Sequence, residues 1–539
     1  MVSGDEYDYI IVGAGSAGCV LANRLSADPK MRVCVVEAGP SDKPALTRFK
    51  ATVPVGNTML LSSPTFNWSY LYEGSEGLHH AGIQAPRGKM AGGSSSVNGM
   101  VYMRGHRRDY DGWAAEGNPG WGYDDVLPVF KRHEHHEAGG DDFHGTGGEL
   151  NVAKLRWLNP LTQAFLAAAG ETQYPANEDF NGARQDGFGA NEVTQKNGRR
   201  WSAARAFLDP ALGRQNLDVL YDALTLRVRL DGRRAAGVDV RVGGETRALT
   251  ARREVILAAG AFNSPHILML SGIGPGDRLA PHGIPVLHEL PGVGRNLQDH
   301  AAAWVNAEDR TGRSFALTAR AMPWLAKGLV SYIFTQQGPF TSNNVEAGGF
   351  IRTRPELEAP DIQFTFMPAM KDFSRWITHR HAFGINACLL QPKSRGHIEL
   401  KSADPAAAPV LHPRFLEHED DVARLVHAIR VARQILSAPA FEAMRGEEIR
   451  PGPHVTTTAQ IVEYLRENLA TIFHPAGTCK MGPRADAMAV VDPSLKLHGM
   501  EGLRVIDASI MPTVTSGNTN APTMMIAERG AGFILTDAR

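Results

Sequence analysis

Hydrophobic positions near the start of the chain change from a strand pattern to a helix pattern and back. Tyr7 to Val12 is a run of β-branched and aromatic residues, a glycine-rich turn follows, and Cys19 to Leu25 fits a helix. A second apolar run, Val33 to Val36, ends at Glu37. The segment therefore predicts a β-α-β unit with an acidic residue at the tip of the second strand.

A different periodicity begins near residue 361. Ile362, Phe364 and Phe366 alternate with Gln363 and Thr365, which predicts an antiparallel sheet with one face in water. Further strands are predicted at residues 383–390, 397–400 and 503–506.

Helical periodicity appears later in the chain. Val422 to Leu436 has hydrophobic residues at intervals of three and four, and a second helix is predicted from about Ala459 to Leu469. Thr457 and Gln460 stand in capping-box spacing at its start. Residues 507–520 read as a loop and residues 523–535 as a helix.

Composition places the chain among folded globular proteins. Its 539 residues suggest two joined domains, and no repeat or low-complexity linker separates them, so we expect the domains to be interleaved along the chain. Lys and Arg number 56 against 57 Asp and Glu, and this balance leaves no broad electrostatic field to attract nucleic acid or an anionic membrane, so a nucleic-acid function is not expected. The four cysteines have no CxxC spacing, which fits a reducing compartment.

The sequence shows neither an export signal nor a membrane span, so we expect a cytoplasmic protein. The start of the chain lacks a basic segment followed by a cleavable apolar stretch, and no apolar run reaches eighteen residues. The segment from Trp324 to Phe334 is the nearest candidate for membrane contact. The favoured interpretation is a helix packed on the protein's own core, and the alternative is a short amphipathic helix lying on the inner face of the membrane.

The glycine-rich turn carries the first chemical signal. Gly13, Gly15 and Gly18 form a GxGxxG motif between a strand and a helix, the arrangement that binds a dinucleotide pyrophosphate at a helix N-terminus. Glu37 follows at the spacing expected for an acceptor of ribose hydroxyl groups, which disfavours a 2′-phosphate. The motif alone does not distinguish NAD from FAD.

A second loop, from Arg87 to Tyr102, has the composition of another cofactor-binding segment. Its glycines permit close backbone approach, and Ser94, Ser95 and Asn98 offer short hydrogen-bonding groups.

With these two loops, the chain resembles the glucose–methanol–choline (GMC) oxidoreductases, and the resemblance extends nearly from end to end. The first family signature is matched by Gly88 to Asp111, although Ala91 stands where a larger aliphatic residue is usual. The second is matched throughout Gly260 to Gly274. The resemblance implies an α/β fold: a doubly wound, Rossmann-like FAD-binding domain and a substrate domain built on an antiparallel sheet.

The resemblance also implies domain boundaries and a mode of flavin binding. Residues 1–155, 210–305 and 475–539 would form the FAD-binding domain, and residues 156–209 and 306–474 the substrate-binding domain. Relatives with covalent flavin carry a histidine at the position of Val97, so we expect non-covalent FAD here.

His474 matches the catalytic histidine of the family, and Asn518 matches the second catalytic position, which is histidine or asparagine in relatives. A base is needed because hydride leaves an alkoxide far more readily than an alcohol, and imidazole can take the hydroxyl proton at neutral pH. The Asn518 amide would donate a hydrogen bond to the developing alkoxide without titrating.

The complete set of expected cofactor contacts joins the glycine motif and Glu37 to positions carried over from the family pattern. They are Gly13, Gly15, Ser16, Ala17, Gly18, Glu37, Ala38, Arg87, Ala91, Gly92, Gly93, Ser95, Asn98, Gly99, Met100, Val101, Val219, Ala259, Gly260, Asp507, Ala508, Asn518, Asn520 and Thr523. Val219 corresponds to the adenine side, and the start of the C-terminal helix near Asn520 would favour negative charge on the reduced flavin.

The resemblance therefore predicts oxidation of a primary alcohol to the aldehyde, with hydride passed to flavin N5. Similarity to bacterial alcohol dehydrogenases of the alkane and polyethylene-glycol degradation type favours a quinone or artificial acceptor, with an alcohol oxidase that uses oxygen as the alternative. A non-redox, flavin-containing lyase and a flavin-binding interaction protein remain as competing hypotheses. No oligomeric state is predicted.

A histidine-rich segment raises the question of a metal. His133, His135 and His136 stand beside Glu134 and Glu137, but the polar, glycine-rich surroundings favour a solvated loop, so no metal is expected. A GxSxG motif is absent from the sequence, which removes the best-known sign of a serine hydrolase.

Overall fold

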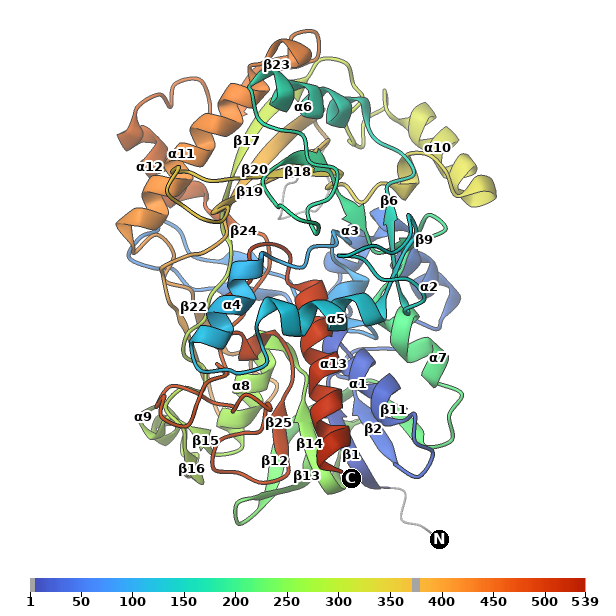
Figure 1. The fold of residues 1–539 in the computed structure, drawn as a ribbon, viewed down its shortest axis with the longest axis vertical. Coiled ribbons are helices and arrows are strands. Elements are labelled where there is room, and N and C mark those ends of the chain that lie inside the picture. Colours follow the sequence, from blue (N-terminus) through green and yellow to red (C-terminus); the bar gives the residue numbers. More distant parts are fainter. Residues whose placement is uncertain (1–4, 371–378, 539) are drawn as a thin grey trace.

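The computed structural model describes residues 5–370 and 379–538, so the first four residues of the chain start that was searched for an export signal lie outside the described residues. Two large sheets organise the chain, one in each half of the elongated molecule (Figure 1). The predicted combination of a doubly wound sheet and an antiparallel sheet is confirmed.

The first sheet has parallel strands on one side and an antiparallel meander on the other. In spatial order its strands are β11 (Leu217–Leu220), β2 (Val33–Val36), β1 (Glu6–Val12), β14 (Glu245–Leu257), β13 (Arg234–Val242) and β12 (Ala223–Asp231), with β25 (Leu503–Val505) beside β14. Every residue of β2 is buried, as expected for a parallel strand with both faces covered.

The predicted β-α-β unit is confirmed as β1, α1 (Ser16–Leu25) and β2. Helix α1 begins three residues before the predicted start, inside the GxGxxG motif, so that Gly18 belongs to the helix. Helix α13 (Asn520–Asp537) packs against α1, so the C-terminal helix covers the first strands of the chain (Figure 1).

The second sheet is antiparallel throughout. Its strands are, in order, β23 (Arg445–Arg450), β17 (Ala301–Asp309), β20 (Ala382–Leu389), β19 (Ile362–Met367), β18 (Ala347–Ile351) and β7 (Gly187–Ala190), with β24 (Ala470–Thr471) paired to β17. Helices α6 (Pro160–Glu171) and α11 (Glu419–Leu436) pack on it, and the rings of Phe165 and Phe366 stack with centroids 4.7 Å apart.

The predicted wet face of this sheet is wrong. All six residues of β19 are buried, including Gln363 and Thr365. Their polar side chains are turned to the interior instead of solvent: Thr365 lines an internal cavity, and Gln363 hydrogen-bonds to Asn518, which lines the same cavity. Polar alternation in this strand thus marks the cavity.

Helix α12 (Thr458–Asn468) has the predicted capping box, with the Gln460 backbone N–H donating to the Thr457 hydroxyl. The other helices are α2 (Ala45–Thr52), α3 (Asn57–Leu61), α4 (Arg107–Ala115), α5 (Tyr123–His133), α7 (Asp209–Ala211), α8 (Gly260–Leu270), α9 (Gly276–Leu279) and α10 (Met322–Thr335). The other strands are β3 (Tyr70–Tyr72), β4 (Ile83–Ala85), β5 (Glu134–His136), β6 (Leu150–Lys154), β8 (Glu192–Val193), β9 (Gln195–Lys196), β10 (Arg199–Arg200), β15 (Ile273–Gly274), β16 (His288–Glu289), β21 (His397–Glu399) and β22 (Val410–His412).

Helix α10 contains the segment from Trp324 to Phe334, which was expected to pack on the protein's own core. This favoured interpretation is wrong. Only Gly328 and Tyr332 of the helix are buried, whereas Ile333 and Phe334 are exposed. In the described part of the chain no helix is both long and apolar enough to cross a bilayer.

Candidate active site

A cavity of about 550 Å³ lies where residues of both sheets meet. Three helices begin at its wall: α1 at Ser16, α8 at Gly260 and α13 at Asn520. The Ser16 hydroxyl donates to the Asn520 side-chain oxygen across 2.7 Å, which ties two of these N-termini together. Unpaired backbone N–H groups and helix dipoles make such a convergence a site for an anionic group such as a pyrophosphate.

Most of the predicted site residues line this cavity. They are Gly13, Gly15, Ser16, Ala17, Glu37, Ala38, Arg87, Gly93, Asn98, Gly99, Met100, Val101, Ala259, Gly260, His474, Asp507, Ala508, Asn518, Asn520 and Thr523.

Five predicted residues lie behind the wall: Gly18, Ala91, Gly92, Ser95 and Val219. Gly18 serves packing, because a Cβ there would lie 1.8 Å from the Gly13 carbonyl oxygen. The Ser95 hydroxyl is turned back onto the Gly92 carbonyl, and Val219 pairs with β2 inside the sheet. At the predicted adenine side, residues 223–225 line the cavity in place of Val219.

The two glycine loops touch each other. Gly93 has a φ of +51°, and a Cβ at this position would lie 2.7 Å from the Gly15 Cα. Gly13, with a φ of +101°, would place a Cβ 2.6 Å from the Ala258 carbonyl oxygen. Only glycine tolerates both the positive φ and the close backbone contact at these two positions. The loop after β1 and the loop before α4 therefore pack directly against each other and form one glycine cradle.

Glu37 lies at the end of β2, as predicted. Its carboxylate accepts hydrogen bonds from the backbone N–H groups of Ala14 and Gly39, at 2.8 and 2.9 Å. Burial outweighs these contacts and raises the pKa of Glu37 to about 7. A carboxylate in this place can still accept further hydrogen bonds from a ribose because each oxygen has two lone pairs.

Several lining residues were missed by the sequence analysis, among them Thr225 and His266. The Thr225 hydroxyl and the His266 Nε2 are buried without a hydrogen-bond partner, and so is the Asn57 side-chain oxygen. Buried polar atoms are normally paired, so these orphans indicate that a polar ligand completes the cavity. With the helix N-termini and the glycine cradle, the residues present fit a flavin dinucleotide.

His474 and Asn518 face each other in the cavity, although 44 residues separate them in the chain. The Asn518 amide nitrogen lies 3.1 Å from His474 Nε2. Asn518 Oδ1 accepts from the Gln363 amide at 3.3 Å, which orients the NH2 group of Asn518 toward the histidine. The two predicted catalytic side chains therefore converge.

A second histidine fixes the tautomer of the first. His300 Nε2 lies 3.0 Å from the Leu390 carbonyl oxygen, which can only accept, so this nitrogen carries the hydrogen. His300 is neutral because burial lowers its pKa to about 4, and its Nδ1 is therefore an acceptor. It lies 2.9 Å from His474 Nδ1, which must donate. His474 Nε2 is left unprotonated, the form required of a base.

Asp299 holds the two histidines together. Its Oδ1 accepts the backbone N–H groups of both His300 and His474 at 2.7 Å, and its Oδ2 accepts the Tyr72 hydroxyl at 2.7 Å. Burial, the neighbouring His300 and the Arg87 guanidinium lower the pKa of His474 well below its usual value. His474 is therefore neutral at pH 7. The sequence analysis missed His300 and Asp299, which no local motif singles out.

The histidine-rich segment after α5 is not the solvated loop that the sequence favoured. His133, Glu134 and His136 are buried, because α5 and β5 carry them into the interior. His144 Nδ1 and Nε2 lie 3.2 Å from Glu134 and Asp179, and Arg104 donates to Glu134 at 2.7 Å.

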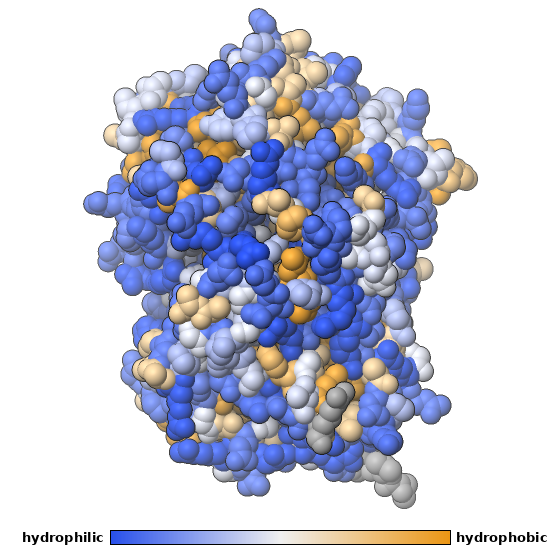
Figure 2. All heavy atoms as spheres, viewed as in Figure 1, coloured by the Kyte–Doolittle hydropathy of each residue, from blue (hydrophilic) through white to orange (hydrophobic). Residues whose placement is uncertain are grey.

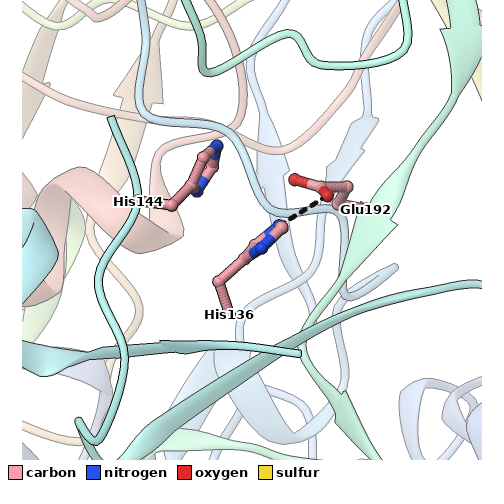
Figure 3. A group of neighbouring side chains, drawn as sticks. All are labelled: His136, His144 and Glu192. Atoms are coloured by element: carbon pink, nitrogen blue, oxygen red, sulfur yellow. Dashed lines mark hydrogen bonds and ion pairs between the residues drawn. The ribbon is translucent and has the colours of Figure 1, made fainter. Parts of the chain in front are cut away.

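The neighbouring trio of His136, His144 and Glu192 comes close enough to suggest a metal centre (Figure 3). The two imidazole rings are stacked, however, with centroids 4.1 Å apart, so their in-plane lone pairs do not converge on one point. Burial would lower the pKa of His144, but hydrogen bonds to Asp179 and Glu134 outweigh it and raise the pKa to about 9. A protonated, doubly paired imidazole favours an ion-pair cluster over a metal site.

Opposite pKa shifts predict a maximum of stability near neutral pH. His133, His266 and His300 are buried and neutral with pKa values lowered to about 4, so the unfolded chain binds more protons below pH 6.5. Each should lose roughly 3 kcal/mol of stabilisation as the pH falls from 6.5 to 4. His144, with its raised pKa, stabilises below pH 6.5 and loses that contribution as the pH rises through 9.

Thermal melting of the holoenzyme between pH 4 and 10 checks this prediction. The melting temperature should decline on both sides, and His144→Gln should melt lower than the parent at pH 6 but lose the decline between pH 6.5 and 9. An alkaline decline of equal size in parent and variant would contradict the assignment to His144.

Comparisons with known proteins agree with this geometry. Family models described as GMC oxidoreductase match residues 7–302 and 392–527. An alcohol dehydrogenase (acceptor) of Pseudomonas putida is 44% identical over 537 residues, covering 98% of this chain and 96% of the relative. An oxygen-dependent choline dehydrogenase of Rhizobium etli is 43% identical over 533 residues, covering 98% and 96%.

Among solved structures, pyridoxine 4-oxidase from Mesorbium loti superposes with a TM-score of 0.87 at 31% identity, covering 98% of both chains. Matches of this length and identity extend over both sheets and the cavity between them. The chain therefore belongs to the GMC oxidoreductases, as its two glycine-rich signatures suggested.

Proposed function

We propose that this protein is an FAD-dependent dehydrogenase that oxidises a neutral primary alcohol to the aldehyde and passes the electrons to a quinone-type acceptor. GMC oxidoreductases depend on FAD, and relatives that act on alcohols support alcohol-type oxidation. The observation that carries the proposal is the convergence of an unprotonated imidazole nitrogen and an amide donor, His474 Nε2 and Asn518 Nδ2, 3.1 Å apart in the cavity.

The roles of the two side chains follow from their hydrogen-bonding capacity. His474 Nε2 accepts the hydroxyl proton of the alcohol, and its Nδ1–H remains bound to His300. Asn518 donates to the oxygen as negative charge develops on it. Val345 and Met367 add an apolar wall that excludes water. FAD, when bound, supplies the hydride acceptor.

Cofactor binding is proposed to follow the family pattern. The N-terminus of α1 would hold the pyrophosphate, Glu37 would accept hydrogen bonds from the ribose, and the N-terminus of α13 would favour negative charge on the reduced flavin ring. Segments 1–155, 210–305 and 475–539 would form the FAD-binding domain, and segments 156–209 and 306–474 the substrate-binding domain.

Val97 lines the cavity and carries no nucleophile, so the flavin is proposed to be non-covalent. Heat denaturation should release all of the flavin into the supernatant.

The cavity favours a neutral alcohol over choline. Among the described lining residues, the carboxylates are Glu37 and Asp507, and both accept backbone N–H groups near the proposed dinucleotide site. A quaternary ammonium group near His474 would therefore lack a carboxylate partner in the described part of the wall. This matters because relatives with nearly the same identity are named choline dehydrogenases.

Anaerobic mixing of the holoenzyme with a panel of alcohols tests the proposal. Neutral primary alcohols should bleach the flavin absorbance and choline should not, and a soluble ubiquinone analogue should then restore the colour faster than oxygen does. Faster recovery with oxygen would indicate an oxidase. A flavin that no alcohol reduces, with turnover of a cyanohydrin, would instead identify a lyase.

A further inference from the structure

We propose that one side of this protein docks on an anionic lipid surface through a face formed by α10 and the neighbouring α2 and α3. The docking face is defined by nine exposed hydrophobic side chains: Leu46, Phe49, Met59, Leu317, Met322, Leu329, Val330, Ile333 and Phe334. These are nine of the thirteen large hydrophobic residues that are exposed in the described part of the chain. Their concentration in two segments separates them from the scattered surface hydrophobics of ordinary proteins.

Helix α10 presents a continuous apolar row to solvent. Met322, Leu329, Val330, Ile333 and Phe334 follow helical spacing along one side, and Phe334 is 81% exposed. The helix projects from the edge of the molecule, where Figure 2 shows hydrophobic residues at the surface. At 14 residues it is about 21 Å long, too short to cross a bilayer but suited to lie in its interface.

The two segments of the docking face belong to one surface. The turn after α10, Pro339–Thr341, contacts the turn between α2 and α3, Pro54–Gly56. Gly328 fits closely against this turn, since a Cβ there would lie 2.7 Å from Pro339. The α10 helix is thus fixed beside α2 and α3, and all three can meet a surface together.

Charge complementarity identifies the occupant as anionic lipid. Residues 43–72 and 310–345 contain no Asp or Glu but seven Lys or Arg, in a chain whose formal net charge is −1. Of these seven, only Arg48 has an acidic partner within ion-pair distance in the described part of the chain. Exposed Lys327 and Arg320 flank the apolar row. Such a surface binds membranes in two ways: its apolar side chains are buried in the bilayer interface, and the basic side chains around them are attracted to anionic headgroups.

The docking face adjoins the wall of the substrate cavity. Asn57 and Leu61 on one side of α3 line the cavity, whereas Met59 on the other side is 58% exposed. A bilayer held against this face would lie next to the cavity that the proposed alcohol must enter. The docking itself does not depend on the alcohol chemistry, so the two proposals can fail separately.

Vesicle flotation of the holoenzyme tests the docking face. The parent should bind vesicles of phosphatidylcholine mixed with phosphatidylglycerol, bind vesicles of phosphatidylcholine alone far less, and be released by high salt. The variant Ile333→Glu/Phe334→Glu, and separately Arg320→Glu/Lys327→Glu, should each reduce binding at least about tenfold.

Matched controls carry the same changes at exposed positions outside the face: Val286→Glu/Leu287→Glu and Lys401→Glu/Arg484→Glu should bind like the parent. Flavin content and melting temperature should be unchanged in all four variants. Equal binding of parent and Ile333→Glu/Phe334→Glu would overturn the proposal. So would a lipid-free dimer, detected by light scattering, that the same variant converts to monomer, because the face would then bind a second copy of the chain.

Discussion

Anaerobic flavin reduction by a primary alcohol is expected to slow by about 10²–10⁴-fold when His474 is replaced by alanine. The reason is that His474 Nε2 is the unprotonated nitrogen beside the Asn518 amide, and hydride transfer needs the hydroxyl proton to be removed. The loss should fall on the rate of reduction at saturating alcohol, because the base acts in the transition state.

Stopped-flow absorbance of the flavin measures this loss directly. FAD content should match that of the parent, since the proposed dinucleotide contacts come from the glycine loops and helix N-termini. Added imidazole should restore part of the rate by entering the space left by the side chain. The exposed His427→Ala serves as a control and should reduce at the parental rate. Parental speed in His474→Ala would show that another group removes the proton.

The parts of this architecture that could be predicted from the sequence are those encoded by local patterns. The β-α-β unit follows from an apolar run, a glycine turn and a second apolar run, and all three lie within residues 6–36. His474 and Asn518 could be named because the motifs around them resemble a known family. Their meeting at 3.1 Å depends on the packing of β17, β19 and the C-terminal loop, which no local pattern reveals.

The sequence predictions that were wrong concern which segments are buried. Gln363 and Thr365 alternate with hydrophobic residues, as a strand with one wet face would, but both are buried. Thr365 lines the internal cavity, and Gln363 hydrogen-bonds to Asn518 at its wall. The segment around His136 is polar in sequence and yet buried, because Arg104, Glu134, Asp179 and His144 neutralise one another. Helix α10 shows the converse: its apolar sequence is typical of a core helix, and the fold leaves it exposed.

Replacing His300 by phenylalanine should produce the second large loss, roughly 10–100-fold in the rate of flavin reduction. His300 acts through His474, so it is a positioning residue. Its Nδ1 accepts the hydrogen of His474 Nδ1, which keeps Nε2 free for the alcohol. Phenylalanine fills the space but offers no acceptor, so His474 can adopt the other tautomer. Glutamine can still accept, and His300→Gln should recover most of the rate.

The pH profile separates this role from a purely structural one. Because burial, His300 and Arg87 hold the pKa of His474 well below its usual value, the parent's rate should stay flat down to pH 6.5 and fall only in more acid solution. Removing the His300 ring removes one of the three influences that lower this pKa. The acid limb of His300→Phe should therefore move to higher pH, with FAD content and melting temperature reported beside it. If the flavin of His300→Phe is reduced as fast as that of the parent, and the acid limb of its pH profile does not move, other groups fix the tautomer of His474.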